Sequence, residues 1–403
     1  MPDFLPFRGT RYRDLPDASR VVAPPYDVID EEDRSRLEAI DPHNAVRLIL
    51  PRADPPTDPY EHAANLLQAW LTDGILAPDP EPAFYGYRMH FTDAADRPRR
   101  TIGVIGALVL PSGDGDVFGH ERTLPKARSD RLALLRATRT NLDPIWGLSL
   151  ARDLNAVLDT EAPPTTSAVD AAGTRHELTL ITDPETLGRL RTAVASAPIV
   201  LADGHHRFET ACAYRDDDPD DPGAQAVMTF VVGLDDDLLD VRAIHRLVHS
   251  APRGLRARLG DLINVDDAGP NTPEGVRDLT IRMTERGALG LVDRDGLALL
   301  TPAPVGSDRI SRDLPAELRD VDAARFDTLV RPALGDAELS YRDDAVTVAS
   351  MVDKGAADLA VLLRPVTVPQ IRAAAFARLR MPEKTSYFSP KPRTGMVFRR
   401  LDD

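Results

Sequence analysis

The sequence predicts a mixed α/β (α+β) fold. Short apolar runs typical of buried strands recur along the chain, separated by segments whose apolar residues have helical spacing. The two kinds of segment alternate irregularly, which favours a mixed sheet over a regular barrel. The chain has 403 residues, 42% of them hydrophobic, which is enough for two or three domains with cores of their own.

The first predicted elements come from apolar patterning and turn residues. Residues 45–50 form an unbroken apolar run apart from one arginine, which indicates a short strand. Residues 59–74 place their apolar side chains on one helix face and end at a glycine that suits a helix C-cap. Residues 83–91 and 101–110 are expected to pair as strands around a polar turn.

The central and C-terminal elements follow in the same way. Residues 176–182 read as a strand, and 183–196 as a helix with Asp183 at the N-cap and Pro184 at its first position. The later elements are a strand at 198–202, a helix at 207–215, a strand at 226–234, a helix and Asp-Gly hairpin within 272–301, a helix at 322–330, a strand at 357–363 and a helix at 368–379.

We expect three regions: an N-terminal α/β region at 1–150, a core at 151–250 and a C-terminal α/β region at 251–403. The first two are expected to share one sheet, because the candidate acid and base residues are divided between them.

Composition excludes several classes of protein. A net charge of −15 makes a broad nucleic-acid interface unexpected. The single cysteine, Cys212, allows no intramolecular disulfide and no thiolate zinc cage. No apolar stretch is long enough for a membrane span, and the N-terminus lacks the apolar segment of a signal peptide, so we expect a cytoplasmic protein without a membrane partner. The oligomeric state is not set by these features.

The main candidate site lies in residues 199–210, which read IVLADGHHRFET. A buried strand would end at Asp203, Gly204 would let the backbone approach a ligand, and a helix would begin near His205. The free amide groups of such a helix favour an anion, and Arg207 offers a fork that matches phosphate oxygens. The segment therefore indicates a phosphate cradle to which His206 would also donate.

Two other interpretations of this segment remain. Asp203 would be only a helix N-cap, with the histidines in a surface turn. Alternatively, Asp203 and the two histidines would bind a metal ion. Adjacent helical histidines point roughly 100° apart, however, which disfavours a shared ion.

A second cluster stands out in this acidic chain and consists of His120, Glu121, Arg122, Lys126, Arg128, Arg131, Arg136 and Arg139. We expect a helix capped by Ser129 or Asp130, which leaves Lys126 and Arg128 in the preceding loop where they would reach a polyanion. Glu121 is a candidate acid, base or magnesium-facing carboxylate. A solvated helix face and a hydrogen-bonded His-Glu pair are the structural alternatives.

Two further motifs carry candidate residues. Pro24 and Pro25 would present Asp27 in a fixed extended geometry as a general base, a metal-bridging carboxylate or an ordinary turn residue. Near the C-terminus, the segment MPEKTSYFSPKP places Lys384 where it would donate to phosphate or form part of a polar loop.

These motifs together resemble a known family. The segments APPYDVI, HERTLPKARSDRLALLRATRTNLDPI, LADGHHRFETA and MPEKTSYFSPKPRTGMVF, in this order, are similar to the prokaryotic family called domain of unknown function 1015. The match spans nearly the whole chain, although that family has no firmly established activity.

The DGHHR turn also resembles a wider superfamily that contains the free serine kinases, sulfiredoxin and the nucleotidase-like domain of ParB proteins. This resemblance implies a ParB/sulfiredoxin-like core around the strand–DGHHR–helix unit, with nucleotide phosphates at Gly204, His205, His206 and Arg207. It also implies Mg²⁺ with ATP or ADP, held through the phosphates or by Asp203 or Glu121. Sulfiredoxin carries a catalytic cysteine where this chain has His205, which argues against sulfiredoxin chemistry.

The leading hypothesis is therefore phosphoryl transfer from a nucleotide to serine or a similar small hydroxylated metabolite. The phosphates would be bound by Gly204, His205, His206 and Arg207, and further donors would be Lys126, Arg128, Arg131 and Lys384. Asp203 would orient metal or substrate. The hydroxyl proton would be accepted by Asp27 or Glu121. The alternatives are a phosphatase or nucleotidase that uses the same cradle, and a ParB-like switch that is gated by nucleotide.

Overall fold

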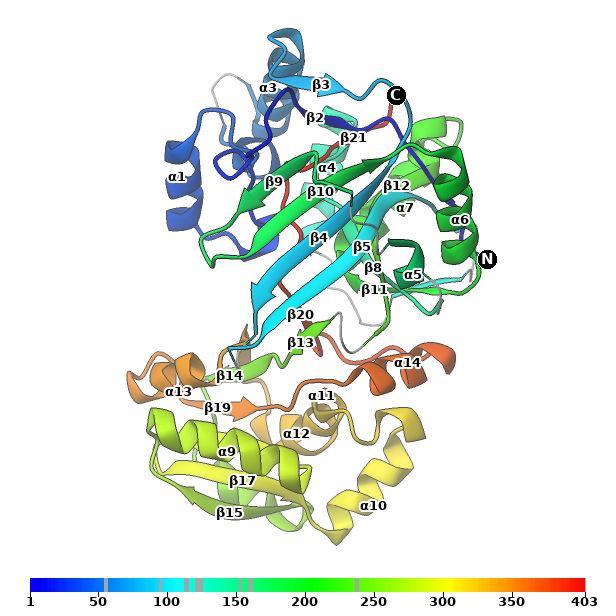
Figure 1. The fold of residues 1–403 in the computed structure, drawn as a ribbon. Coiled ribbons are helices and arrows are strands. Elements are labelled where there is room, and N and C mark those ends of the chain that lie inside the picture. Colours follow the sequence, from blue (N-terminus) through cyan, green and yellow to red (C-terminus); the bar gives the residue numbers. More distant parts are fainter. Residues whose placement is uncertain are drawn as a thin grey trace. The chain divides into compact units, whose positions relative to one another are not determined.

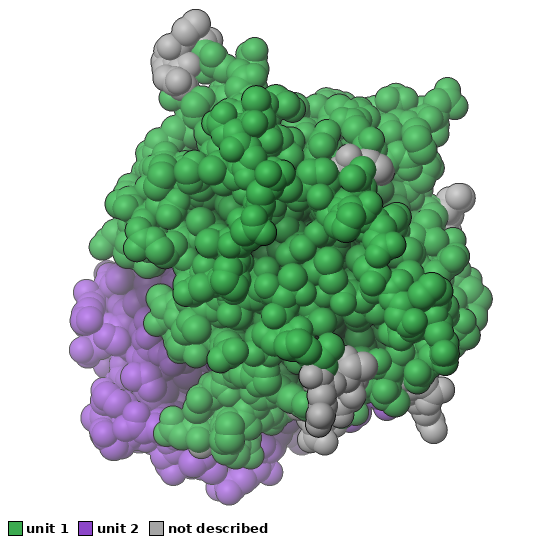
Figure 2. All heavy atoms as spheres, turned by 45° about the horizontal axis from the view of Figure 1, so that its top comes forward, with its two compact units in different colours: residues 1–119, 123–240, 390–403 green, residues 120–122, 241–389 purple. Residues whose placement is uncertain are grey.

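The structure of the protein is a computed structural model. It describes residues 1–53, 57–93, 96–111, 116–119, 126–151, 154–158, 162–235 and 239–402. The chain forms two compact units (Figure 2). Unit 1 contains residues 1–119, 123–240 and 390–403, and unit 2 contains residues 120–122 and 241–389. Both units combine helices with β-sheets, which confirms the predicted mixed α/β fold class.

Unit 1 is built on one large mixed sheet (Figure 1). Its strand order is β6-β11-β8-β12-β5-β4-β10-β9, and β1 also pairs with β5. Most neighbours are antiparallel, whereas β11 and β6, and β12 and β8, are parallel. The strands are β1 Phe4–Leu5, β4 Phe84–Thr92, β5 Pro98–Val109, β6 Val117–Gly119, β8 Ile145–Ser149, β9 Thr166–Val169, β10 Arg175–Ile181, β11 Ile199–Asp203 and β12 Ala226–Gly233.

This sheet confirms two expectations. Strands β4 and β5 pair antiparallel from Tyr85 opposite Ile105 to Thr92 opposite Pro98, as their patterning predicts. The sheet also joins N-terminal strands to the strand that precedes the DGHHR turn. Every residue of β12 and the first four of β11 are buried, so the site rests on the densely packed centre of the unit.

Helices and short strands complete unit 1. Helices α5, α6 and α7 contribute buried side chains to the same hydrophobic cluster as the large sheet. The helices are α1 Glu31–Ile40, α2 Val46–Ile49, α3 Pro59–Thr72, α4 Lys126–Thr138, α5 Leu154–Leu158, α6 Pro184–Ala195 and α7 His205–Asp217, with 3₁₀ turns η1 Tyr26–Val28 and η2 Pro222–Gln225. Strand β2 (Thr10–Tyr12) pairs with β3 (Leu76–Pro78), and β7 (Thr140–Asn141) pairs with β21 (Arg399–Arg400).

Helix caps explain why α3 and α6 are predicted well. Asp183 accepts a hydrogen bond from the Thr186 amide at 2.8 Å, and Pro184 occupies the first position of α6. Asp58 caps α3 in the same way, and Gly74 follows that helix with a φ of 71°.

The predicted strand at 45–50 is wrong, because residues 46–49 form helix α2. The side-chain oxygen of Asn44 accepts a hydrogen bond from the Val46 backbone amide at 3.0 Å. The side-chain nitrogen of Asn44 donates to the backbone carbonyl of Arg20 at 2.8 Å. Val46, Leu48 and Ile49 are all buried. A short apolar run that is buried on every side carries no periodicity that would separate a helix from a strand.

The start of helix α4 also differs from the prediction. The helix begins at Lys126, so Lys126 and Arg128 lie in its first turn and not in a preceding loop. Asp130 does not cap the helix, because its carboxylate accepts from the Tyr60 hydroxyl at 2.8 Å and from Arg131 Nε at 2.7 Å.

Unit 2 contains an antiparallel sheet with the order β15-β17-β16-β19-β14-β18. Helices α9 and α13 cover a cluster of buried apolar residues from this sheet. The strands are β14 His245–His249, β15 Ile263–Gly269, β16 Leu289–Asp293, β17 Gly296–Pro302, β18 Glu338–Arg342 and β19 Leu359–Leu362; the short strands β13 Asp240–Arg242 and β20 Tyr387–Ser389 lie near its chain ends.

The helices of unit 2 include the predicted ones. The expected Asp-Gly hairpin is present as β16 and β17, directly after α9. The expected helix at 322–330 consists of an α-helical turn followed by a π-helix. The elements are α8 Leu255–Arg258, η3 Gly260–Leu262, α9 Pro273–Arg286, α10 Pro304–Asp313, η4 Ala316–Leu318, α11 Asp322–Arg325, the π-helix η5 Phe326–Val330, α12 Arg331–Leu334, α13 Ala345–Asp353 and α14 Val368–Phe376.

The two units follow a different division from the three predicted regions. The last segment, 390–403, belongs to unit 1, so unit 2 is an insertion in the chain of unit 1. Sequence patterning does not reveal that the chain returns to unit 1 at residue 390. The described part of the last segment contributes only the two-residue strand β21 and isolated β-bridges at Thr394 and Phe398, which leave no apolar pattern in the sequence.

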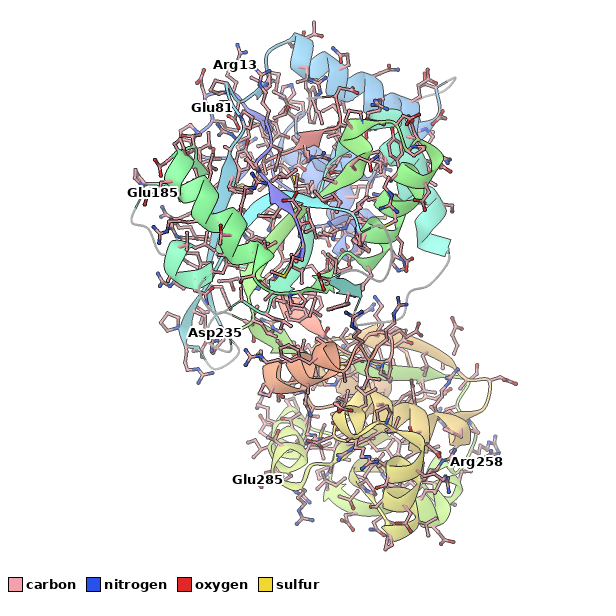
Figure 3. All side chains as sticks on the ribbon, turned by 90° about the vertical axis from the view of Figure 1, so that its right-hand side faces the viewer. Arg13, Glu81, Glu185, Asp235, Arg258 and Glu285 are labelled. Carbon is pink, nitrogen blue, oxygen red and sulfur yellow. The ribbon has the colours of Figure 1, made fainter. Side chains whose placement is uncertain are left out.

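Charged side chains of both signs lie on the surface of each unit (Figure 3). Arg13 and Glu185 are exposed on unit 1, and Arg258 and Glu285 are exposed on unit 2. Among the residues that the structure describes, no helix is long and apolar enough to cross a membrane.

Candidate functional site

The predicted strand–turn–helix unit is present at β11 and α7. Gly204 joins them with a φ of 84°, in the left-handed region that favours glycine. A Cβ atom at this position would lie 2.8 Å from the Cγ2 atom of Ile145. The first hydrogen bond within the helix runs from the Phe208 amide to the Gly204 carbonyl at 2.9 Å. The amides of His206 and Arg207 therefore precede the helical hydrogen-bond ladder, where an anion is favoured.

Asp203 is not the cap of helix α7. Gly204 occupies the N-cap position, and no side chain in the described parts of the chain caps the helix there. One carboxylate oxygen of Asp203 accepts from Lys391 Nζ at 2.8 Å, and the other accepts from Arg207 Nη2 at 2.9 Å. The positive charges of Lys391 and Arg207 outweigh the effect of burial and hold the pKa of Asp203 well below its usual range. Asp203 is thus an ionised group that fixes two cations beside the helix N-terminus.

Lys391 is a site residue that the sequence analysis missed. Its ammonium group lies 2.8 Å from an oxygen of Asp27 and 2.8 Å from an oxygen of Asp203, and 8% of its side chain is exposed. Burial lowers the pKa of Lys391, but the two carboxylates more than offset this effect and raise it above its usual value. Asp27, in turn η1, is thereby brought to Asp203 across 176 residues of sequence (203 − 27).

Arg207 points inward. Its Nη1 donates to the Pro144 carbonyl at 2.7 Å, and its Nη2 donates to Asp203. Its Nε is buried and has no hydrogen-bond partner among the residues that the structure describes. In this conformation Arg207 orients Asp203 and presents a single unsatisfied donor, so the expected bidentate contact with phosphate stays a prediction.

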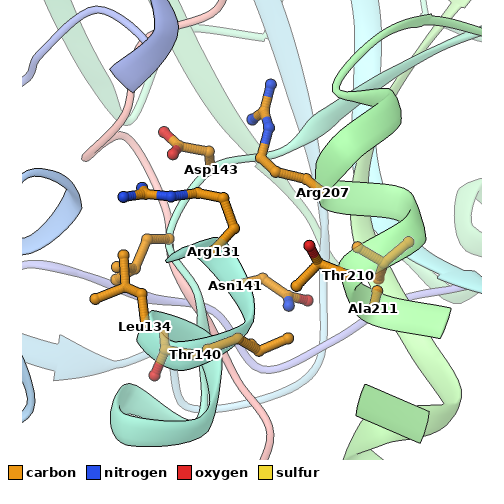
Figure 4. A pocket seen from close by; sticks show the side chains of 11 residues that line it. Arg131, Leu134, Thr140, Asn141, Asp143, Arg207, Thr210 and Ala211 are labelled. Carbon is orange, nitrogen blue, oxygen red and sulfur yellow. The ribbon is translucent and has the colours of Figure 1, made fainter. Parts of the chain in front are cut away.

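A cavity of about 50 Å³ lies between helices α4 and α7 and the strands beneath them (Figure 4). The side chains of Arg131, Asp143, Arg207 and Thr210 line its polar part. Thr210 is 3% exposed, and its hydroxyl oxygen has no hydrogen-bond partner within the described parts of the chain. Buried polar groups are normally hydrogen-bonded, so the unsatisfied Thr210 hydroxyl and Arg207 Nε indicate a cavity that holds a polar group.

Asp143 is a second site residue that the sequence analysis missed. It lies between β7 and β8, is buried, and accepts a hydrogen bond from the Thr394 hydroxyl. Burial raises the pKa of Asp143 to about 6, although the positive charges of Arg207 and Arg131 act in the opposite direction.

The other predicted residues have different surroundings. His206 is half-buried, and its Nδ1 has no partner among the described residues, whereas His205 begins α7 beside it. Arg131 donates to the Ile49 carbonyl at 2.8 Å, and its guanidinium carbon lies 4.2 Å from the centre of the Tyr26 ring. Arg131 therefore holds Tyr26, next to Asp27, against helix α4.

For four predicted residues the described structure does not test a place in this site. Lys384 belongs to unit 2, where its carbonyl accepts from Arg246 Nη1 at 2.8 Å. Glu121 lies outside the described residues, as do the side chains of Lys126 and Arg128. Within the described ranges, no group of three or more His, Cys, Asp or Glu residues has a geometry that would hold a metal ion.

Comparison with known proteins gives one family and several solved structures. The family model described as "Protein of unknown function (DUF1015)" matches residues 4–324. No curated protein matches the chain.

The solved structures that match have low sequence identity. A conserved hypothetical protein from Pyrococcus furiosus is 12% identical, with a TM-score of 0.40, and the match covers 72% of this chain and 93% of that protein. A free serine kinase in complex with AMP is 13% identical, with a TM-score of 0.40, and the match covers 71% of this chain and 89% of that protein. SbnI with a C-terminal truncation, from Staphylococcus aureus, is 10% identical, with a TM-score of 0.39 and coverage of 72% and 84%.

Proposed function

We propose that this chain, which belongs to the DUF1015 family of proteins of unknown function, transfers a phosphoryl group from a nucleotide to a small hydroxylated metabolite. One observation carries the proposal: the N-terminus of α7 begins at Gly204, has no side-chain cap among the described residues, and stands next to a partly buried cluster that contains Lys391, Asp203 and Arg207. Phosphoryl transfer depends mainly on positioning and on neutralising the charge of the phosphates, and this arrangement supplies both.

Each site residue has a defined part in the proposed reaction. The amides of His206 and Arg207 and the His206 side chain would donate to the phosphate oxygens. Lys391 and Arg207 supply two positive charges, and Asp203 fixes their positions. Lys126, Arg128 and Arg131 remain further donors in the proposal because they belong to helix α4, which packs against α7.

Magnesium fits this site only as an ion that arrives with the nucleotide. Each oxygen of Asp203 accepts a hydrogen bond from a cation, Lys391 or Arg207, and these two positive charges disfavour a metal ion at the same carboxylate. Mg²⁺ commonly binds through substrate phosphates with few protein ligands. When bound there, Mg²⁺ would neutralise charge on the phosphates of ATP or ADP.

Free serine is the first acceptor to test, because the DGHHR motif is most similar to the turn of the free serine kinases. Water is the second, because a cavity of about 50 Å³ has room for a water molecule beside Asp143. With water as acceptor, the same site would act as a phosphatase or nucleotidase.

The test is product analysis by phosphorus NMR. Purified protein is incubated with Mg²⁺ and ATP or ADP, with and without serine and other small alcohols. Formation of a phosphomonoester that depends on the alcohol supports the proposal, and release of inorganic phosphate alone supports the hydrolase. His206→Ala should abolish either reaction, whereas His90→Ala, an exposed histidine on β4, should not. A fully active His206→Ala variant contradicts the assignment.

A further inference from the structure

We propose that Asp143 is the general base of this site, which removes the proton from the acceptor hydroxyl group while that group occupies the cavity beside Arg207 and Thr210. This inference rests on the proposed phosphoryl transfer and names a catalytic residue for it. It replaces the candidates Asp27 and Glu121 in that role.

The position of Asp143 gives it access to the cavity. Its Oδ1 accepts from the Thr394 hydroxyl, whereas its Oδ2 accepts no hydrogen bond from any residue that the structure describes. Asp143 lines the cavity together with Arg207 and Thr210, and Figure 4 shows its carboxyl group at the same end of the cavity as the Arg131 and Arg207 guanidinium groups. One oxygen of Asp143 is thus held in place and the other is available to accept a proton.

The neighbouring carboxylates are less suited to this task. Both oxygens of Asp203 bind cations, and an oxygen of Asp27 binds the Lys391 ammonium group at 2.8 Å. The positive charges of Lys391 and Arg207 lower the affinity of Asp203 for a proton. Asp143 has no such direct ion pair among the described residues, and its burial favours the protonated form that general-base catalysis produces.

The cavity also indicates which part of a substrate it takes. A cavity needs roughly 10–15 Å³ of this kind of space to hold a water molecule, so about 50 Å³ admits a water molecule or a hydroxymethyl group. The Thr210 hydroxyl and Arg207 Nε have no hydrogen-bond partner among the described residues, and the oxygen of a primary alcohol would satisfy both. Thr210 and Arg207 are three residues apart on α7 and therefore lie on the same helix face.

The proton and electron balance of the step is simple. The O–H bond of the acceptor breaks, its proton moves to Oδ2 of Asp143, and the acceptor oxygen forms a bond to the transferred phosphorus. The bond between that phosphorus and the bridging oxygen breaks, and the leaving nucleotide keeps the electron pair. Asp143 then releases the proton to solvent, and no oxidant or further reactant is needed.

The test is the pH dependence of kcat for the wild-type protein and three variants. The wild-type kcat should fall about tenfold per pH unit below a pH of about 6, where Asp143 becomes protonated. Asp143→Asn cannot accept the proton, so its kcat at pH 7 should fall roughly 10²- to 10⁴-fold and lose the acid limb. Its nucleotide Kd should stay within about threefold of the wild-type value, because the proposed donors to the phosphates are the amides and side chains of α7 and not Asp143.

Two further variants separate catalysis from folding. Thr394→Val removes the donor to Oδ1, so the acid limb should move to higher pH while turnover remains, because the hydroxyl stabilises the ionised carboxylate. Asp27→Asn should keep the acid limb. If Asp143→Asn is folded and keeps both its rate and the limb, or if Asp27→Asn loses the limb, the assignment of Asp143 is wrong. A wild-type protein that binds nucleotide but transfers no phosphoryl group to an alcohol or to water would refute the proposed function itself.

Discussion

Replacement of Lys391 by methionine should destabilise unit 1 by about 2 kcal/mol at pH 7. Lys391 is 8% exposed and joins two carboxylates, and removal of one partner of a buried ion pair typically costs about 3–5 kcal/mol. Two features reduce this cost. Arg207 still pairs with Asp203 at 2.9 Å, and the Asp27 side chain, 38% exposed, regains water. Methionine has a similar length, so the packing of the side chain is largely kept.

The effect should depend on pH in a defined direction. The folded-state pKa of Asp203 is lowered, so the stability that its ion pairs contribute is present above the unfolded pKa of about 3.9 and is lost as the pH falls towards the folded value. The folded-state pKa of Lys391 is raised, so its contribution is present below the unfolded pKa of about 10.4 and is lost as the pH rises beyond it. The difference between wild type and Lys391→Met should therefore be constant from about pH 5 to 9 and shrink at pH 3.

The assay is urea unfolding followed by tryptophan fluorescence. The chain has two tryptophans, Trp70 and Trp146, which are both buried in unit 1, so their emission reports on that unit. Lys354→Met, at an exposed lysine of unit 2, is the control and should change the unfolding free energy by less than about 0.5 kcal/mol. A Lys391→Met effect no larger than that of the control, or one that persists undiminished at pH 3, would refute the ion-pair reasoning.

Three other substitutions test the geometry of the site. Gly204→Ala should lower the free energy of unfolding more than Gly173→Ala does. Both glycines have a φ near +80°, but only a Cβ at position 204 would lie 2.8 Å from Ile145. Urea unfolding compares the two variants, and equal losses would contradict the close contact. Thr210→Val should leave stability unchanged or raise it by up to about 1 kcal/mol, because the hydroxyl has no partner in the part of the chain that the structure describes, yet it should lower turnover. Melting and kinetic assays check both, and a clear loss of stability would contradict an unsatisfied hydroxyl. Asn44→Ala should cost about 2–3 kcal/mol in urea unfolding, because the fully buried amide satisfies backbone groups on both sides; a loss below about 0.5 kcal/mol would show that those groups find other partners.

Local signals explain which parts of the fold are predictable from the sequence. Asp183 and Pro184 mark the start of α6, and two apolar runs on either side of a polar turn mark β4 and β5, so these elements are where the sequence places them. Val46, Leu48 and Ile49 are buried in a run too short to show periodicity, and the carboxylate of Asp130 binds side chains in place of a helix amide. Both failures occur where tertiary contacts decide the local structure.

The candidate site was predictable only in its local part. The strand, Gly204 and the helix follow one another in sequence, and their order indicates a phosphate cradle. Lys391 lies 188 residues from Asp203, and Thr394 lies 251 residues from Asp143. No spacing rule connects such residues, because the return of segment 390–403 to unit 1 brings them together. The C-terminal motif MPEKTSYFSPKPRTGMVF contains both Lys391 and Thr394 and was the one available signal.

The central claim, that nucleotide phosphates bind at the N-terminus of α7, is tested most directly by titration calorimetry. ATP, ADP and CTP are titrated with Mg²⁺ into the wild-type protein, into His206→Ala and into His90→Ala as the matched control. We expect heat of binding for at least one nucleotide with the wild type and with His90→Ala, and its loss with His206→Ala. Binding that is unchanged in His206→Ala, or no binding of any nucleotide to the wild type, would contradict the claim.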